Sequence, residues 1–167
     1  MIALPAIAEA QSQITPTDYA KLLRSVALRD LGVEEFEAKV VHEVLDKNGS
    51  LRLSLRRNIE CLDLSAQQSI FLATYVVRGS IERKVAFHLR VTYRIVLSVE
   101  QQLPAAFWAI YSSQNIDLTA WPFVRELVHA TTARMNVPRL LLPLNVHGSV
   151  FGPPNGSKLA RRRAPAD

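Results

Sequence analysis

Residues 85–99 read VAFHLRVTYRIVLSV, the most regular alternation of apolar and polar side chains in the chain. Every odd-numbered position in this stretch is aliphatic or aromatic, and most even-numbered positions are His, Arg, Thr or Ser. Because successive side chains of a strand point to opposite faces of the sheet, this period of two predicts a β-strand. Its 15 residues would span roughly 50 Å at about 3.3 Å per residue. We expect a second subunit to cover the part of so long a strand that extends past the core.

The residues before this stretch predict three more strands. Residues 36–42 and 51–61 also alternate, and Asn48-Gly49 between them is a hairpin signal because both residue types tolerate positive φ. The pair Arg56-Arg57 interrupts the second alternation and predicts a bulge or a twist. Residues 70–79 (IFLATYVVRG) are apolar on both faces, which is typical of a strand that is covered on both sides.

Helical spacing lies on both sides of the strand region. Before it, we expect a short helix that begins around Pro16 and ends near Gly32. After it, residues 103–112 predict one short helix. A second helix is expected from Asp117 or Thr119 to about residue 134, with its first turn containing Pro122. The order of elements predicts an α+β fold, an antiparallel four-stranded sheet followed by two helices packed on one side.

The ends of the chain differ in composition from its middle. Residues 1–16 are expected to form a loosely held N-terminal arm, and residues 17–147 a single domain. Residues 148–167 are rich in Pro, Gly and basic side chains, which predicts a disordered basic tail. The formal net charge is +5, and the last ten residues hold four basic side chains against one acidic one. The excess charge of the domain itself is therefore small.

The residues that could support chemistry are few. Cys61 is the only cysteine, which excludes an internal disulfide, fits a cytoplasmic location and predicts an inert buried thiol. His42, His88, His129 and His147 form no metal-binding pattern, and we expect His42 and His88 on a face of the sheet. We expect no catalytic residue, no metal and no cofactor, and therefore no enzymatic activity. The opening MIALPAIAEAQSQ is apolar and has an A-x-A-like end, but no basic residue precedes its short apolar stretch and Pro5 interrupts it, so we expect no signal peptide. No apolar run is long enough to cross a membrane.

The carboxy-terminal half contains two motifs with a familiar order and spacing. Residues 121–126 read WPFVRE, Arg134 follows, and residues 138–146 read PRLLLPLNV. This half resembles that of the SecB-family export chaperones, in which an aromatic–Pro–aromatic–small–Arg–Glu motif opens the main helix and a P-x-L-x-L-x-P-V-N-F-like segment follows. Asn115 matches a polar position in the interhelical loop of that family. The resemblance covers residues 115–147, about a fifth of the chain.

The resemblance implies a fold and a function. It implies a SecB-like domain that binds non-native polypeptide without ATP, as a homodimer or homotetramer. Its clients would be preproteins for export, or the antitoxin of a toxin–antitoxin pair. Export members use acidic sheet residues to dock on the translocase motor SecA, and this chain departs from that pattern with Arg52, Arg56, Arg90 and Arg94. The extended segment is also one residue shorter than the family form and has Val146 where Phe is usual.

A chaperone without a motor holds its client by equilibrium contacts, so it needs exposed apolar surface and partners for an extended main chain. The residues that we predict to line the client groove are Phe107, Trp108, Tyr111, Ile116, Leu118, Trp121 and Phe123. The alternative for half or more of them is that they are core or subunit-interface residues. We interpret Arg125 and Glu126 as residues that pair with a loop or another subunit.

Two other classes of function fit the sequence. The four arginines of the sheet could make a basic face that binds nucleic acid, with steeply salt-dependent affinity. Alternatively, the fold could be used by an enzyme or a binding protein for a small molecule, which would need an enclosed pocket with converging polar groups.

Overall fold

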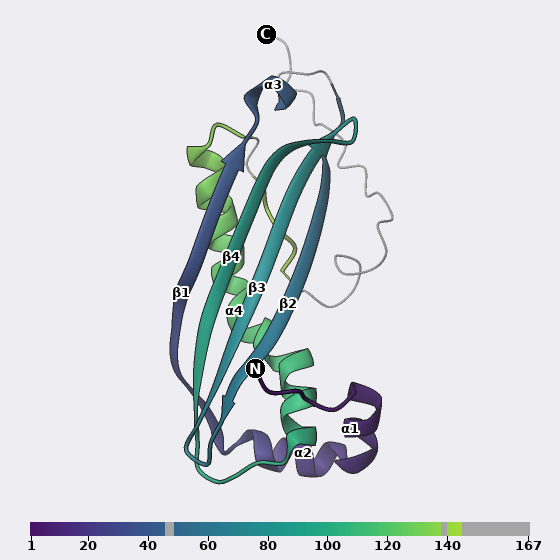
Figure 1. Ribbon diagram of the computed structural model, residues 1–167, viewed down its shortest axis with the longest axis vertical. Coiled ribbons are helices and arrows are strands. Elements are labelled where there is room, and N and C mark those ends of the chain that lie inside the picture. The colour runs from purple at the N-terminus through teal and green to yellow at the C-terminus, as the bar shows by residue number, and fades with distance from the viewer. Residues whose placement is uncertain (46–48, 138–139, 145–167) are drawn as a thin grey trace.

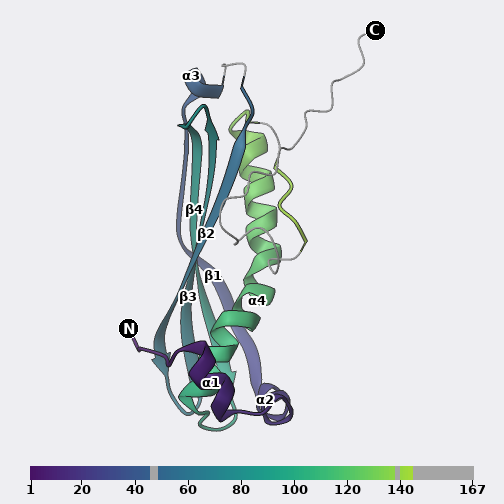
Figure 2. The same ribbon diagram turned by 90° about the vertical axis from the view of Figure 1, so that its right-hand side faces the viewer.

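The computed structural model describes residues 1–45, 49–137 and 140–144. The elements, in chain order, are α1 (Ile7–Gln13), α2 (Pro16–Leu23), β1 (Val26–Val40), α3 (His42–Leu45), β2 (Arg52–Leu64), β3 (Gln68–Ile81), β4 (Lys84–Val99) and α4 (Ala105–Arg134). The strands form one antiparallel sheet in the order β1-β4-β3-β2, and α4 runs along one face of it (Figures 1 and 2). The predicted α+β fold with a four-stranded antiparallel sheet is confirmed. The predicted disordered tail, 148–167, lies outside the described residues.

The core lies between α4 and the two central strands. β4 spans the stretch with the alternating pattern, and its helix-facing side chains, such as Leu89 and Ile95, are buried. Those of β3, such as Phe71 and Tyr75, are buried beside them. The other face of β3 carries Ile70, Leu72 and Val76, which stay half-buried. The expected cover on both sides of this strand is therefore not found in the described part of the chain, since its helices lie on one side of the sheet.

The carboxy-terminal helix differs from its prediction. One continuous helix, α4, replaces the two predicted helices and their loop. The polar stretch around Asn115 and Asp117 suggested a loop, but both side chains have partners elsewhere in the fold, Tyr19 and Arg57, and remain helical. The 30 residues of α4 span about 45 Å at 1.5 Å per residue. The helix therefore matches most of the length of β4 and covers one of its faces. The second subunit that was expected to cover this strand stays a prediction.

The amino-terminal elements also differ from the prediction. The arm contains α1, and α2 begins at Pro16 as predicted, but β1 already begins at Val26. Gly32, the expected end of the helix, lies within β1 opposite Arg94 of β4. Pairing with the long central strand thus overrides the local helical spacing.

The two edge strands do not form the hairpin that Asn48-Gly49 predicted. β1 pairs with β4 and β2 pairs with β3, so the segment between β1 and β2 crosses from one edge of the sheet to the other. His42 opens α3 in this connection rather than lying on the sheet face. The hairpin between β3 and β4 turns instead at Glu82 and Arg83, which both have positive φ. Neither residue type signals such a turn in the sequence.

Candidate peptide-binding surface

The seven predicted groove residues all lie on α4, but they do not form one groove. Five are buried in the core: Phe107, Trp108, Tyr111, Ile116 and Trp121. Only Leu118 and Phe123 are accessible, 62% and 45% exposed respectively. Five residues along a helix correspond to a rotation of about 500°, so these two side chains point to flanks about 140° apart.

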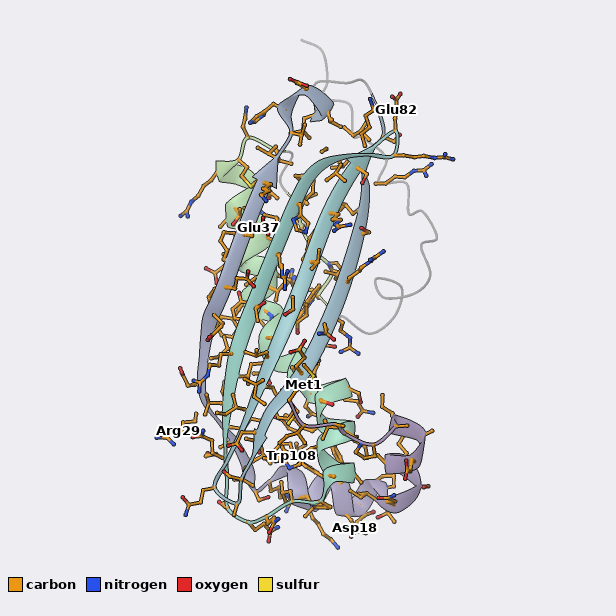
Figure 3. All side chains as sticks on the ribbon, viewed as in Figure 1. Met1, Asp18, Arg29, Glu37, Glu82 and Trp108 are labelled. Carbon is orange, nitrogen blue, oxygen red and sulfur yellow. The ribbon has the colours of Figure 1, made fainter. Side chains whose placement is uncertain are left out.

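The buried aromatic residues fix the first turns of α4 against the sheet. The ring of Trp108 lies 5.7 Å from that of Phe71 on β3 and 5.1 Å from that of Phe107. On its other side, the Phe107 ring lies 5.1 Å from the ring of Tyr19 on α2. Figure 3 shows Trp108 between the lower part of the sheet and the start of α4. These rings hold the helix in place, and a client could reach them only if that part of the core opened.

A buried polar cluster anchors the middle of α4. The fully buried Asp117 carboxylate pairs with the Arg57 guanidinium of β2 and accepts a hydrogen bond of 2.9 Å from the Tyr75 hydroxyl of β3. Burial raises the pKa of Tyr75, and the nearby Asp117 carboxylate raises it further, so the phenol remains a donor. Of the two alternatives expected at Arg56-Arg57, a bulge or a twist, the bulge is wrong, because the register shift of β2 falls between Cys61 and Asp63. Arg57 instead occupies a regular helix-facing position. A charged residue at an inward position was the available signal that a buried partner exists.

The extended segment 140–144 runs antiparallel to α4. The main-chain N–H of Leu140 donates to Thr132 Oγ1 at 3.3 Å, Arg125 Nε donates to the Leu142 carbonyl at 3.0 Å, and Trp121 Nε1 donates to the Pro143 carbonyl at 2.8 Å. The partner of Arg125 is thus a main-chain carbonyl. From Leu140 to Pro143, each successive partner on α4 lies one or two helical turns closer to the start of the helix.

This arrangement gathers exposed leucines on one flank of α4. Leu141 and Leu144 are 79% and 76% exposed, while Leu140 and Leu142, on either side of Leu141, are buried. The Pro143 carbonyl is hydrogen-bonded to Trp121, and the segment runs toward the start of α4. The next residue, Leu144, therefore lies on the side of Leu118, which is about one helical turn before Trp121. We call Leu118, Leu141 and Leu144 the α4 flank surface.

Amide side chains adjoin this surface. An open pocket of about 420 Å³ is lined by Tyr19, Gln114, Asn115 and Leu118. The Tyr19 hydroxyl donates to Asn115 Oδ1 at 2.6 Å, and burial raises the pKa of Tyr19 to about 12. Gln114 is exposed to solvent. The pocket therefore offers amide groups beside a leucine, which suits an extended peptide better than a small molecule that needs enclosure.

A second exposed apolar area lies on the edge strand β1. Leu28, Val33 and Phe36 lie opposite residues of β4 that face α4, and yet they are 49%, 53% and 43% exposed. We call these three residues the β1 strip. Among the described residues, β1 has no strand on its outer side, so its main-chain groups are open along that edge.

The open face of the sheet has mixed charge. The predicted basic residues Arg90 and Arg94 lie on it, but β1 places acidic side chains beside them, including Glu35, whose Oε2 is 3.8 Å from Arg90 Nε. Glu37, labelled on β1 in Figure 3, lies opposite Arg90. The acidic side chains of β1 flank the arginines of β4 at the edge of this face and weaken the positive potential that nucleic-acid binding would need.

Cys61 and the potential metal ligands are the other candidates for chemistry among the described residues. Cys61 is buried, as predicted, and burial raises the pKa of its thiol to about 11. Within residues 1–45, 49–137 and 140–144, no group of three or more His, Cys, Asp or Glu side chains could hold a metal ion. None of the helices in those ranges is long and apolar enough to span a membrane.

Comparison with known proteins identifies the fold. No protein-family model and no curated protein matches the chain. Among solved structures, it is similar to the Mycobacterium tuberculosis Rv1957 SecB-like chaperone, which was solved in complex with a ChAD peptide from the Rv1956 HigA1 antitoxin. The TM-score is 0.59 at 14% sequence identity, over 77% of this chain and 96% of that one. The chain has a SecB-like fold. A Streptococcus agalactiae protein of unknown function matches with a TM-score of 0.45 at 14% identity, over 71% of this chain and 96% of that one.

The WPFVRE motif, residues 121–126, does not lie where the sequence predicted it. The WPFVRE motif was expected to open the main helix, but it lies in the middle of α4, which begins at Ala105. Pro122 is therefore inside the helix, where it leaves the Leu118 carbonyl without its usual intrahelical donor.

Proposed function

We propose that this protein is an ATP-independent holdase that binds extended segments of non-native polypeptide on the α4 flank surface. The observation that carries the proposal is a set of three leucines along α4, all more than half exposed, of which Leu118 lines a pocket with amide side chains. Leucine side chains that are exposed along one flank promote aggregation unless a partner covers them, so they commonly mark a binding site. The SecB-like fold supports the proposal, since the similar M. tuberculosis protein was solved with a bound antitoxin peptide.

The leucines of this surface and the amides beside it would make different contacts with a client. Leu118, Leu141 and Leu144 would take apolar side chains of the client out of water. The amides of Gln114 and Asn115 would exchange hydrogen bonds with the client's main chain, as peptide-recognition sites commonly do. No step in this mechanism uses a nucleotide or a covalent intermediate.

We further propose that two copies of the chain associate through β1. A long edge strand with an apolar strip needs a cover, and a second copy presents the same strand. Association would repeat the α4 flank surface in one particle, so that several weak client contacts act together. Replacing Val33 and Phe36 with Lys should lower the sedimentation coefficient toward that of a monomer, whereas an unchanged oligomer would refute this interface.

Two client classes remain to be distinguished, a preprotein for export and an antitoxin. The genes beside this one separate them. A toxin–antitoxin pair there would indicate the antitoxin, and direct binding of a peptide from that antitoxin would then test it.

The holdase function is tested by light scattering. The purified protein is expected to suppress aggregation of a chemically denatured test protein, without ATP and at near-equimolar ratio. The variant with Leu118, Leu141 and Leu144 all replaced by Ser should lose most of this effect. The control is Val85→Ser, which removes a 44% exposed side chain at the start of β4. Equal suppression by both variants would show that clients bind elsewhere.

A further inference from the structure

Residues 1–14 form a strap that lies across the beginning of α4. The main-chain N–H of Ile2 donates to the Cys61 carbonyl on the edge strand β2 at 2.8 Å. The chain then continues into α1, which packs beside the first turns of α4 (Figures 1 and 2). Leu4 and Ile14 flank this contact and are half-buried. We call residues 1–14 the N-terminal strap.

The strap covers a small apolar patch. Ala10 is fully buried, and it forms a separate hydrophobic cluster with Ala106, Ala109 and Ile110 of α4. These three residues of α4 are themselves at least 90% buried. In these first turns of α4, aromatic side chains such as Trp108 pack on the sheet. The strap covers the side of the helix that carries Ala106, Ala109 and Ile110.

Few interactions hold the strap in place. α1 has only seven residues, its N-cap residue Ala6 makes no capping hydrogen bond, and Ala10 is its only buried residue. Among the described residues, no ion pair joins the strap to the rest of the fold. Segments with so little buried apolar area open at a low free-energy cost.

The patch under the strap and the α4 flank surface belong to one stripe of the helix. Ala106, Ile110, Gln114 and Leu118 are spaced by four residues, which aligns them along one side of α4. The strap covers the first two, while Gln114 and Leu118 are exposed. The strap therefore ends where the open part of the stripe begins.

We propose that the N-terminal strap is an internal competitor for the client site. When it is docked, the client contacts only the open part of the stripe. When it is released, an apolar client segment extends onto Ala106, Ala109 and Ile110. This inference rests on the proposed holdase function and adds its regulation. The strap lowers the apparent affinity for clients by the fraction of time that it is docked.

A pair of matched substitutions on α1 tests the release of the strap. Ala10→Glu places a charge in the buried cluster and should undock α1, whereas Ala8→Glu adds the same charge at an exposed position of the same helix. Hydrogen exchange of residues 7–13 reports undocking. With A10E, the concentration needed for half-suppression of aggregation should fall by about threefold or more, and with A8E it should match the wild type. An undocked A10E protein with unchanged activity would overturn the proposal, and so would an A10E protein in which α1 stays protected.

The opposite experiment locks the strap in its docked position. Ile2 lies directly opposite Cys61 in an antiparallel bridge, where Cα atoms are about 4.5–5.5 Å apart, a separation that a disulfide accepts. Oxidised Ile2→Cys should hold clients less well than the wild type and should recover on reduction, with Ile2→Ser as the control. Equal activity of the oxidised and reduced forms would overturn the proposal. Failure of the disulfide to form in a protein whose Cys61 an alkylating reagent does modify would also overturn it, because the docked position would then be absent in solution.

These experiments separate the two proposals. If neither the wild type nor A10E suppresses aggregation, the holdase function itself is wrong. If the wild type is active and neither the release nor the lock changes its activity, only the role of the strap is wrong.

Discussion

The two halves of α4 are buried in different ways. In the first half, every residue from Ala106 to Tyr111 is buried, so this part is covered all round. In the second half, burial falls on Trp121, Val124 and Val128, at the spacing of a helix with one apolar face. The sheet and α2 cover one side of the first half, and the strap covers another. The second half rests on the sheet and the segment 140–144, and its flank remains open.

Different residues of α4 are therefore expected to determine the stability of the protein and its binding of clients. The side of α4 that faces the sheet carries the large aromatic residues and the Asp117 cluster, and substitutions there should lower the free energy of unfolding. The flank and the patch under the strap carry small or exposed apolar residues, and substitutions there should change binding with little effect on folding.

The largest effect on stability is expected from Trp108→Ala. The side chain is buried against Phe71 and Phe107, so its removal leaves a cavity in the core. The free energy of unfolding should fall by about 4 kcal/mol in urea denaturation. Phe123→Ala, at the half-exposed aromatic of the same helix, is the matched control and should cost about 1 kcal/mol or less. Similar losses for both variants would contradict the assignment of the two halves.

A smaller loss is expected from Asp117→Asn. The substitution keeps the shape but removes the charge that the Arg57 guanidinium faces in a mostly buried site. The free energy of unfolding should fall by about 2–3 kcal/mol. Glu126→Gln, an exposed carboxylate on the same helix, should leave it unchanged within about 0.5 kcal/mol. If the two amide variants have the same stability, the buried pair does not anchor the helix.

The smallest effect concerns the segment that carries two of the flank leucines. Arg125→Met removes the hydrogen bond to the Leu142 carbonyl but keeps much of the aliphatic stem. The loss of stability should be about 1 kcal/mol, together with faster hydrogen exchange in residues 140–144. Arg134→Met, at the exposed end of α4, should change neither quantity. Unchanged exchange in R125M would mean that the segment is held by its buried leucines alone.

The sequence predicted the features of the fold that depend on periodicity. The alternation in residues 85–99 indicated the central strand and its buried face, and the end of α4 at Arg134 was placed correctly. Features that depend on distant partners were missed. The polar stretch at Asn115 and Asp117 suggested a loop because Tyr19 and Arg57 lie 96 and 60 residues away. The Asn-Gly pair suggested a hairpin, although strand pairing is decided by the whole sheet.

The candidate site could be predicted only in part for a similar reason. Aromatic residues on α4 suggested a groove, but large rings are also the best core formers, and the sheet buries five of the seven predicted residues. Leu118 was identified correctly as accessible. Leu141 and Leu144 were missed as candidates, because their exposure depends on how an irregular segment lies against α4.

The position of the bound client is the most direct test of the holdase proposal. A photo-crosslinking amino acid is placed at Leu118, and separately at Val85, in otherwise unchanged protein. Each is mixed with a purified, denatured test protein and irradiated. Crosslinks should form at position 118 and be nearly absent at position 85. Equal crosslinking at both positions, or none at position 118 while aggregation is suppressed, would contradict the account.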